Sequence, residues 1–397
     1  MKKEEYEKKL VNKMSEELQR KFKKAAQTII AAGPMPFPLT DTFIKILTYY
    51  LDDKDLEFIK AFKIKASQTM DQLKQALPGW SEEDIDQAAS KLAKAGFMFN
   101  QPSSKGFMVY RLMPIVMIGA FEYQFMQQLP KDEEGIQRLK EISELYEKLM
   151  KELAGAVQKN YDSFTTAFQK TPSFDRTVPL TKTTEGKTIK IDKTIGAEEV
   201  VLPSQTVEEI INKYDDIAVG NCFCRQYREM LGETFDIGIS SEVCFMFGKS
   251  AKHVIQQGFA RRVTKKEALD IMKKVEAAGL VHKAFHNKSD ITQEENSICN
   301  CHPAYCDSFR LNREGAFPVL NTAFYLSQID PETCTGCGIC IEKCPIEAIS
   351  LNEDNRAIVD DQRCIGCGVC AHFCPADAVS LKEGQRRIFI PPVRAKA

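Results

Sequence analysis

Fourteen cysteines dominate the chemistry that this sequence can support, and all of them lie at or beyond Cys222. Eight occur in two copies of C-x-x-C-x-x-C-x-x-x-C-P, in DPETCTGCGICIEKCPIEAISL and, thirty residues later, in DDQRCIGCGVCAHFCPADAVSL. Three closely spaced thiolates can hold three corners of one [4Fe–4S] cube, and the cysteine before proline then serves the other cube. We therefore assign Cys334, Cys337, Cys340 and Cys374 to one cluster, and Cys344, Cys364, Cys367 and Cys370 to the other.

Glycines accompany both copies of this motif. Gly336, Gly338, Gly366 and Gly368 allow the backbone to approach the inorganic sulfide closely. Structural zinc sites are usually built from paired C-x-x-C segments, which do not explain a doubled three-plus-one spacing. Residues 328–384 therefore resemble the bacterial two-cluster [4Fe–4S] ferredoxins. This resemblance implies a pseudo-twofold βαβ–βαβ fold and one-electron transfer between two neighbouring clusters.

Six further cysteines lie upstream, in NCFCR, SEVCFMFG and SICNCHPAYC. They are Cys222, Cys224, Cys244, Cys299, Cys301 and Cys306. A C-x-C pair on an extended chain places both side chains on one face, about 7 Å apart, which suits a polynuclear cluster. Three interpretations remain open: a third [4Fe–4S] cluster held by four of the six, a structural zinc site, or thiols that bind no metal. His302 adjoins this set, and we expect it to contact the metal ligands rather than to bind the metal itself.

The upstream motifs also carry a broader resemblance. The segments NCFCRQ, SEVCFMFG, TKKEAL with AAGLVH, and SICNC are similar to those of a set of anaerobic iron–sulfur proteins. That set combines a winged-helix N-terminus, a C-x-C-R segment, an ICNC region and a terminal two-cluster ferredoxin, so the resemblance covers most of the chain. This sequence departs from the pattern where His302, Pro303, Ala304 and Tyr305 occupy positions at which the relatives carry more cysteines.

Periodicity and turn residues predict an α+β fold of several domains, two of which carry these cysteines. Ser81 and Asp84 form a capping-box pattern at the start of a helix, and a β-hairpin is expected directly after that helix. The expected segments are an N-terminal helix and proline-rich linker (1–40), a winged-helix-like domain (41–128), a long amphipathic helix (129–165), an α/β middle domain with the upstream cysteines (166–327), the ferredoxin-like module (328–384) and a basic tail (385–397). The amphipathic stretch 131–160 approaches coiled-coil length and could also join two copies of the chain.

The overall composition is that of a folded protein, with 43% hydrophobic and 27% charged residues. A formal net charge of -1 excludes a generic binder of polyanions. The longest uncharged apolar stretch, LMPIVMIGAF, is too short to cross a bilayer core of about 30 Å, so no transmembrane segment is expected. The charged N-terminus does not resemble a signal peptide, and we expect a cytoplasmic protein with reduced cysteines.

These features predict a protein that relays single electrons through two clusters, and through an upstream metal centre, to or from a partner reductase or flavoprotein. One alternative is a catalytic iron–sulfur oxidoreductase subunit with the upstream centre as its active centre. A second alternative, a redox-sensing winged-helix DNA-binding regulator, is disfavoured because the helix at the recognition position opens with Ser-Glu-Glu-Asp, which repels phosphates. No nucleic-acid partner is therefore expected. The sequence contains no phosphate-binding loop, dinucleotide fingerprint or nucleophile elbow, and no catalytic acid–base pair is apparent.

Overall fold

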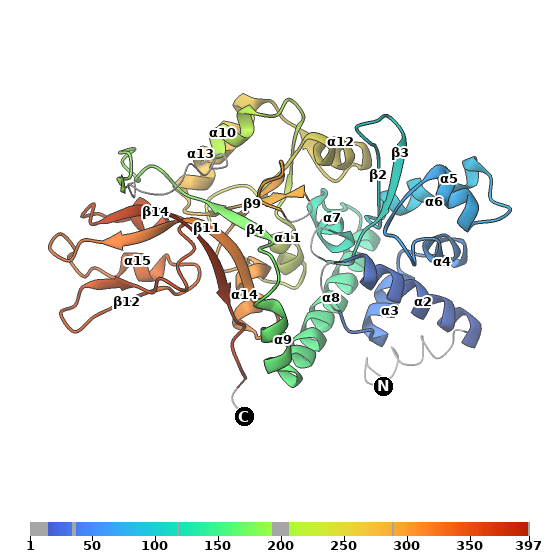
Figure 1. Ribbon diagram of the computed structural model, residues 1–397, viewed down its shortest axis with the longest axis horizontal. Coiled ribbons are helices and arrows are strands. Elements are labelled where there is room, and N and C mark those ends of the chain that lie inside the picture. Colours follow the sequence, from blue (N-terminus) through green and yellow to red (C-terminus); the bar gives the residue numbers. More distant parts are fainter. Residues whose placement is uncertain (1–14, 34–36, 117–118, 193–205, 288–289, 396–397) are drawn as a thin grey trace. The chain divides into compact units, whose positions relative to one another are not determined.

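The computed structural model describes residues 15–33, 37–116, 119–192, 206–287 and 290–395, and the chain divides into two compact units (Figure 1). The first unit comprises 1–156, 226–233 and 253–260, and the second comprises 157–225, 234–252 and 261–397. Three of the five divisions between these ranges fall within helices, namely α8 (Glu133–Lys159), α11 (Phe223–Met230) and α12 (Gly248–Gln257). In the described ranges, no helix is both long enough and apolar enough to cross a membrane.

The first unit combines helices with a small antiparallel sheet in the order β1-β3-β2. Its other elements are α2 (Glu16–Ala32), α3 (Asp41–Thr48), α4 (Asp53–Lys60), β1 (Ser67–Thr69), α5 (Met70–Ala76), α6 (Glu82–Lys94), β2 (Met98–Pro102), β3 (Met108–Leu112) and α7 (Ala120–Met126). The predicted capping box is confirmed at α6, where the Ser81 Oγ accepts from the Asp84 N–H at 3.1 Å and the Asp84 carboxylate accepts from the Ser81 N–H at 3.2 Å. The predicted hairpin is confirmed by the antiparallel pairing of β2 with β3.

Two of the predicted helices can be compared with this unit directly. The charged N-terminal helix is confirmed from Glu16 onward, and residues 1–14 lie outside the described residues. The long amphipathic helix is confirmed as α8, whose apolar side chains Leu139, Ile142, Leu145, Leu149 and Leu153 are buried. Two aromatic rings of α7 pack on its Tyr146, with ring centroids 4.5 Å apart for Phe121 and 6.0 Å apart for Phe125. Much of the apolar face of α8 is therefore used inside its own unit.

The second unit is built on a nine-stranded sheet in the order β5-β14-β11-β4-β9-β10-β7-β6-β8. The strands of this sheet are β4 (Asp175–Val178), β5 (Ile191–Asp192), β6 (Ile217–Asn221), β7 (Glu242–Phe247), β8 (Arg261–Arg262), β9 (Val281–His286), β10 (Glu295–Cys301), β11 (Val319–Ile329) and β14 (Val379–Ile390). Helices α9 (Tyr161–Phe168), α10 (Val207–Asn212), α13 (Lys265–Ala277) and α14 (Asp307–Arg313) also belong to this unit. Six of its strands, β4, β6, β7, β9, β10 and β11, have buried side chains along most of their length, whereas β5, β8 and β14 do not.

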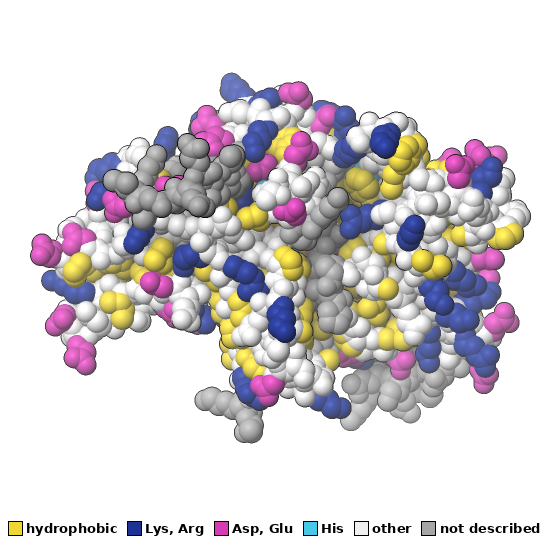
Figure 2. Space-filling view, in the orientation of Figure 1, with side chains coloured by type: hydrophobic (Ala, Val, Ile, Leu, Met, Phe, Trp, Pro, Cys, Tyr) yellow, Lys and Arg dark blue, Asp and Glu magenta, His cyan; other side chains and the backbone are white. Residues whose placement is uncertain are grey.

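The two cysteine repeats form part of this second unit. Together with the strands that precede them, they form β11, α15 (Ile339–Glu342) and β12 (Ile349–Leu351), followed by β13 (Ala357–Val359), α16 (Val369–His372) and β14. Strands β12 and β13 form a separate antiparallel pair, whereas β11 and β14 pair with each other inside the large sheet. The predicted division between residues 327 and 328 thus lies within the continuous strand β11. Both signs of charge are distributed over the face shown in Figure 2, in keeping with the nearly neutral composition.

Candidate metal centres

The structure gathers the eight C-terminal cysteines into two groups of four. The pKa of Cys340 is raised by burial and by negative charge on three neighbouring sulfurs, and the same causes raise the pKa of Cys367. We name Cys334, Cys337, Cys340 and Cys374 the first quartet, and Cys344, Cys364, Cys367 and Cys370 the second quartet. The three sulfurs that raise the pKa of Cys340 are the other members of the first quartet, and those that raise the pKa of Cys367 are the other members of the second. In each quartet, the cysteine before proline comes from the opposite repeat, which is the grouping that the spacing predicts.

The first quartet surrounds a hollow of about 360 Å³, part of which is open to solvent. Gly336 and Gly338 line it with φ angles of 69° and 78°, in the left-handed region that favours glycine. A Cβ on Gly336 would lie 2.2 Å from the Asn355 carbonyl oxygen. The backbone N–H groups of Ala357 and Gly336 donate to the Cys334 sulfur and lower its pKa. Four thiols, close-approaching glycine backbone and N–H donors to sulfur fit a [4Fe–4S] cluster, which when bound takes up and releases one electron.

The second quartet is more deeply buried than the first. Cys364, Cys367 and Cys370 are buried, whereas Cys337 of the first quartet is exposed. Burial raises the pKa of Cys370 to about 12, although the Ser327 hydroxyl lies 3.2 Å from its sulfur. Because iron binds thiolates, loading of this quartet must release protons from buried thiols.

A segment between β4 and β5 lies against the second repeat. Residues 180–190, which we name the covering segment, include Leu180, whose N–H donates to the Cys367 carbonyl at 2.9 Å, and Thr184, whose N–H donates to the His372 carbonyl at 3.0 Å. A Cβ on Gly368 would lie 2.6 Å from the Leu180 carbonyl oxygen. At Gly338, the equivalent glycine of the first repeat, a Cβ would meet no described atom within 4 Å. The chain itself covers one repeat at this glycine, whereas no described residue covers the other there.

The six upstream cysteines also meet, near one end of three neighbouring strands. Strands β6, β7 and β10 are adjacent in the sheet, and the pairing of Ile298 with Phe245 continues to place Cys299 opposite Cys244. We name the set the sextet; it consists of Cys222 after β6, Cys224 on α11, Cys244 on β7, Cys299 and Cys301 on β10, and Cys306 at the start of α14. Sheet pairing therefore assembles thiols that lie more than fifty residues apart in the sequence.

Hydrogen bonds between thiols link the members of the sextet. Cys224 and Cys244 hold the pKa of Cys222 well below its usual value, and Cys224 and Cys301 do the same for Cys306. Hydrogen bonding to Cys222 and Cys299 raises the pKa of Cys244. All six sulfurs thus form one connected set with two favoured thiolate positions. Among the described residues, however, no three His, Cys, Asp or Glu side chains are placed to share a single metal ion.

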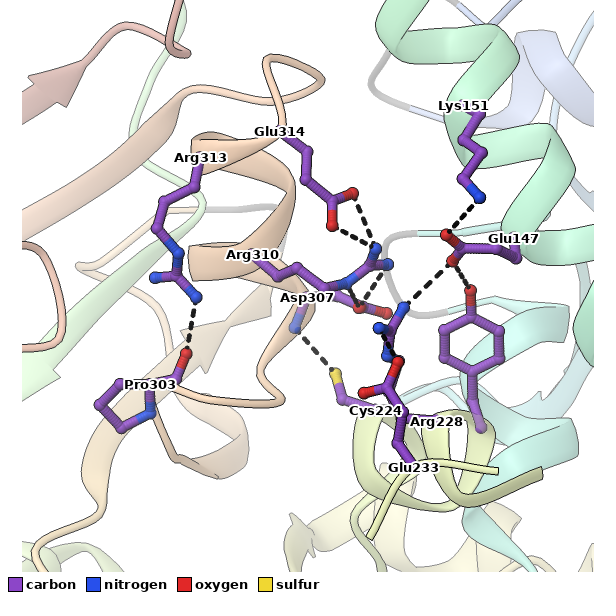
Figure 3. Close-up of polar contacts among 11 residues, drawn as sticks. Glu147, Lys151, Cys224, Arg228, Glu233, Pro303, Asp307, Arg310, Arg313 and Glu314 are labelled. Atoms are coloured by element: carbon purple, nitrogen blue, oxygen red, sulfur yellow. Dashed lines mark hydrogen bonds and ion pairs between the residues drawn. The ribbon is translucent and has the colours of Figure 1, made fainter. Parts of the chain in front are cut away.

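Helix α14 supplies a further donor to the sextet (Figure 3). The Asp307 N–H lies 3.4 Å from the Cys224 sulfur and donates to it. The Asp307 carboxylate pairs with Arg310 at 2.9 Å, and Arg310 also pairs with Glu314 at 2.7 Å. These ion pairs hold the first turn of α14, and so they fix the positions of Cys306 and of the Asp307 N–H group.

A buried lysine also lies beside the sextet. Lys283 on β9 is buried, and its Nζ lies 3.1 Å from the Asp175 carboxylate. Burial by itself would lower the pKa of Lys283, but Asp175 and negative charge on Cys301 and Cys306 outweigh burial and raise it. Lys283 therefore carries a positive charge that can offset negative charge on the nearby sulfurs. The sequence did not reveal this residue, because a lysine in a strand gives no signal until its ion-pair partner is known.

Tyr305 brings a hydroxyl group to the same place. In the described structure its side chain is fully buried and its hydroxyl has no hydrogen-bond partner. Burial, and then negative charge on Cys222 and Cys301, raises its pKa, so the hydroxyl lies near the sextet sulfurs. The Tyr305 ring stacks on His302 with centroids 5.2 Å apart. In the sequence Tyr305 appeared only as one of four residues that interrupt the cysteine pattern.

Comparison with known proteins identifies one part of the chain. Residues 327–381 match the family model of the 4Fe-4S dicluster domain. A probable ferredoxin from Methanosarcina thermophila is 47% identical over 34 residues, which are 9% of this chain and 59% of that protein. The match thus spans less than two thirds of the relative's length. No solved structure matches the chain. The C-terminal region is therefore a ferredoxin-like iron–sulfur domain within a larger chain.

Proposed function

We propose that this protein is an iron–sulfur electron-transfer protein in which each quartet holds one [4Fe–4S] cluster. The observation that carries the proposal is that the two quartets are assembled inside the segment that matches the dicluster domain. The assignment of individual ligands follows the quartets as defined above. The chain exchanges single electrons with a partner oxidoreductase, either a reductase or a flavoprotein.

We further propose that the sextet holds a third metal centre, a [4Fe–4S] cluster ligated by four of its six thiolates. The connected sulfurs, the Asp307 N–H donor and the buried positive charge of Lys283 support a centre that carries net negative charge. A zinc ion bound by the same thiols is the alternative that the metal analysis below distinguishes.

The packing of the second unit supports a connected series of sites. Cys301 and Cys306 share one hydrophobic core with Cys364 and Cys367 of the second quartet. Cys344 packs against that core and also against a second core, which contains Cys334 of the first quartet. Continuous apolar packing therefore runs from the sextet through the second quartet to the first quartet. Such packing keeps water out and suits the transfer of single electrons.

The first unit has a separate place in this proposal. We propose that its helices and the β2–β3 hairpin form a winged-helix-like module that docks protein or stabilises the chain, and that α8 can contribute to self-association. The start of α6 supports protein rather than DNA as the partner, because Glu82, Glu83 and Asp84 occupy its first turn. We place the protein in the cytoplasm, where thiols remain reduced.

Metal analysis of anaerobically purified protein tests these proposals. About twelve iron ions per chain and Mössbauer spectra of [4Fe–4S] type are expected, with reversible one-electron reduction in a redox titration followed by electron paramagnetic resonance (EPR). About eight iron ions with one zinc ion would refute the third cluster and leave the first proposal intact. A colourless, iron-free protein after reconstitution would refute both.

A further inference from the structure

The two repeats differ in what lies against them, although they share motif and backbone conformation. Gly338 and Gly368 have φ angles of 78° and 73°, and Glu347 and Asp377 have φ angles of 54° and 52°, at positions thirty residues apart. The second repeat is nevertheless covered by residues 180–190, and the first repeat has no described segment in the equivalent place. The chain therefore contains its own example of what binds to such a face.

The covering segment shows which chemistry this face accepts. Its backbone bonds to the repeat through Leu180 and Thr184, and Leu180 is buried. Its Lys187 Nζ pairs with the Asp377 carboxylate at 2.8 Å. The occupant is thus an extended segment that combines an apolar side chain with a lysine. In the first repeat Glu347 stands at the position of Asp377, and it is exposed.

The open face also has the composition of a docking surface. Leu351 and Ile358 of the β12–β13 hairpin remain 39% and 48% exposed, beside the exposed Glu353 and Asp354. Around β12 of Figure 1, Figure 2 shows acidic side chains next to hydrophobic ones. Between Asp330 and Asp361 the sequence has eight acidic residues and only two basic ones. Local negative charge around an apolar centre favours encounter with a basic partner.

From this we infer that the open face of the first repeat, formed by Cys337, Gly338, Glu347, Leu351 and Ile358, is the docking surface for a redox partner with a lysine-rich contact surface. The inference rests on the proposed electron-transfer function and names the side of the protein on which electrons are exchanged. The partner's lysines take the place beside Glu347 that Lys187 takes beside Asp377, and its apolar side chains cover Leu351 and Ile358.

Electron transfer to mitochondrial cytochrome c, a basic haem protein, serves as the probe. The full-length protein is reduced anaerobically and mixed with oxidised cytochrome c at low and at high salt. The variant Glu347→Lys/Asp354→Lys is compared with Glu208→Lys/Asp270→Lys, which has the same change in net charge but lies on α10 and α13. A second variant, Leu351→Ser/Ile358→Ser, removes the apolar part of the face.

The expected result is a wild-type rate that falls steeply with salt and drops at least tenfold in Glu347→Lys/Asp354→Lys, while the control remains within twofold. The apolar variant should lose rate at both salt concentrations. Equal losses in the control, or no loss in the two face variants, would overturn the inference. Benzoquinone, a small neutral acceptor, is measured in parallel, and all variants should reduce it at the wild-type rate. A wild-type protein that reduces neither acceptor would instead refute the proposed function.

Discussion

Gly368 and Gly338 provide a matched pair of substitutions that measures how firmly the covering segment presses on the second repeat. Alanine at either position keeps a left-handed backbone, which costs about 1 kcal/mol. Only at Gly368 does the new Cβ meet backbone, because it would lie 2.6 Å from the Leu180 carbonyl oxygen. Relief of this contact breaks the 2.9 Å hydrogen bond from Leu180 to Cys367, worth about 1 kcal/mol, and partly re-exposes a leucine whose full burial contributes about 1.5–3 kcal/mol.

We therefore expect Gly368→Ala to destabilise the second unit by about 1–3 kcal/mol more than Gly338→Ala does. With a urea dependence of about 2 kcal/mol per molar, the extra loss moves the urea midpoint down by about 0.5–1.5 M. Anaerobic urea titrations of both variants, followed by circular dichroism and by the visible absorption of the clusters, measure the difference. Equal midpoints for Gly338→Ala and Gly368→Ala would refute the reasoning, because both variants share the strain of the left-handed backbone.

Three further substitutions test buried groups. Lys283→Met leaves the Asp175 carboxylate buried without its cation, and thermal unfolding should show a loss of about 3–5 kcal/mol in stability. The double variant Lys283→Met/Asp175→Asn should recover most of that loss. A double variant as unstable as the single one would contradict the pairing. Burial lowers the pKa of His253 from 6.5 to about 4, so between pH 4 and pH 6.5 the unfolded chain binds more protons than the folded chain. The free energy of unfolding should therefore fall by about 3 kcal/mol as the pH drops from 6.5 to 4. His253→Phe should flatten this dependence, while Phe99→Leu, which alters the ring 4.6 Å away, should lower stability at every pH and keep the slope. Tyr305→Phe should lower the midpoint potential of the proposed upstream centre at unchanged metal content, because it removes a buried hydroxyl near the sulfurs. An unchanged potential would show that the hydroxyl does not face a metal at this place.

Local signals in the sequence predicted the local structure well. The Ser81 capping box, the hairpin after it and the long helix α8 follow from side chains that are neighbours along the chain. The two repeats were visible because eight ligands and their glycines recur at a fixed interval. The match to the dicluster domain over 327–381 supports this part of the interpretation.

Features that depend on pairing between distant segments could not be predicted in this way. The contact of Cys244 with Cys299 depends on the antiparallel register of β7 and β10, which no local pattern specifies. The covering segment is a loop of ordinary composition, and its place on the second repeat depends on backbone hydrogen bonds that any residue can make. The role of Lys283 depends on its ion pair with Asp175, which lies more than one hundred residues away in the sequence.

Strands β11 and β14 lie inside the nine-stranded sheet, between β5 and β4. A cut at residues 328 and 384 would sever both strands and leave β5 without Leu381 and Lys382, the β14 residues with which it pairs, so that its backbone would be open to pairing with other chains. The metal-binding repeats are for this reason a poor choice for transplantation as a cassette. Engineers who wish to borrow them have to take the surrounding strands as well.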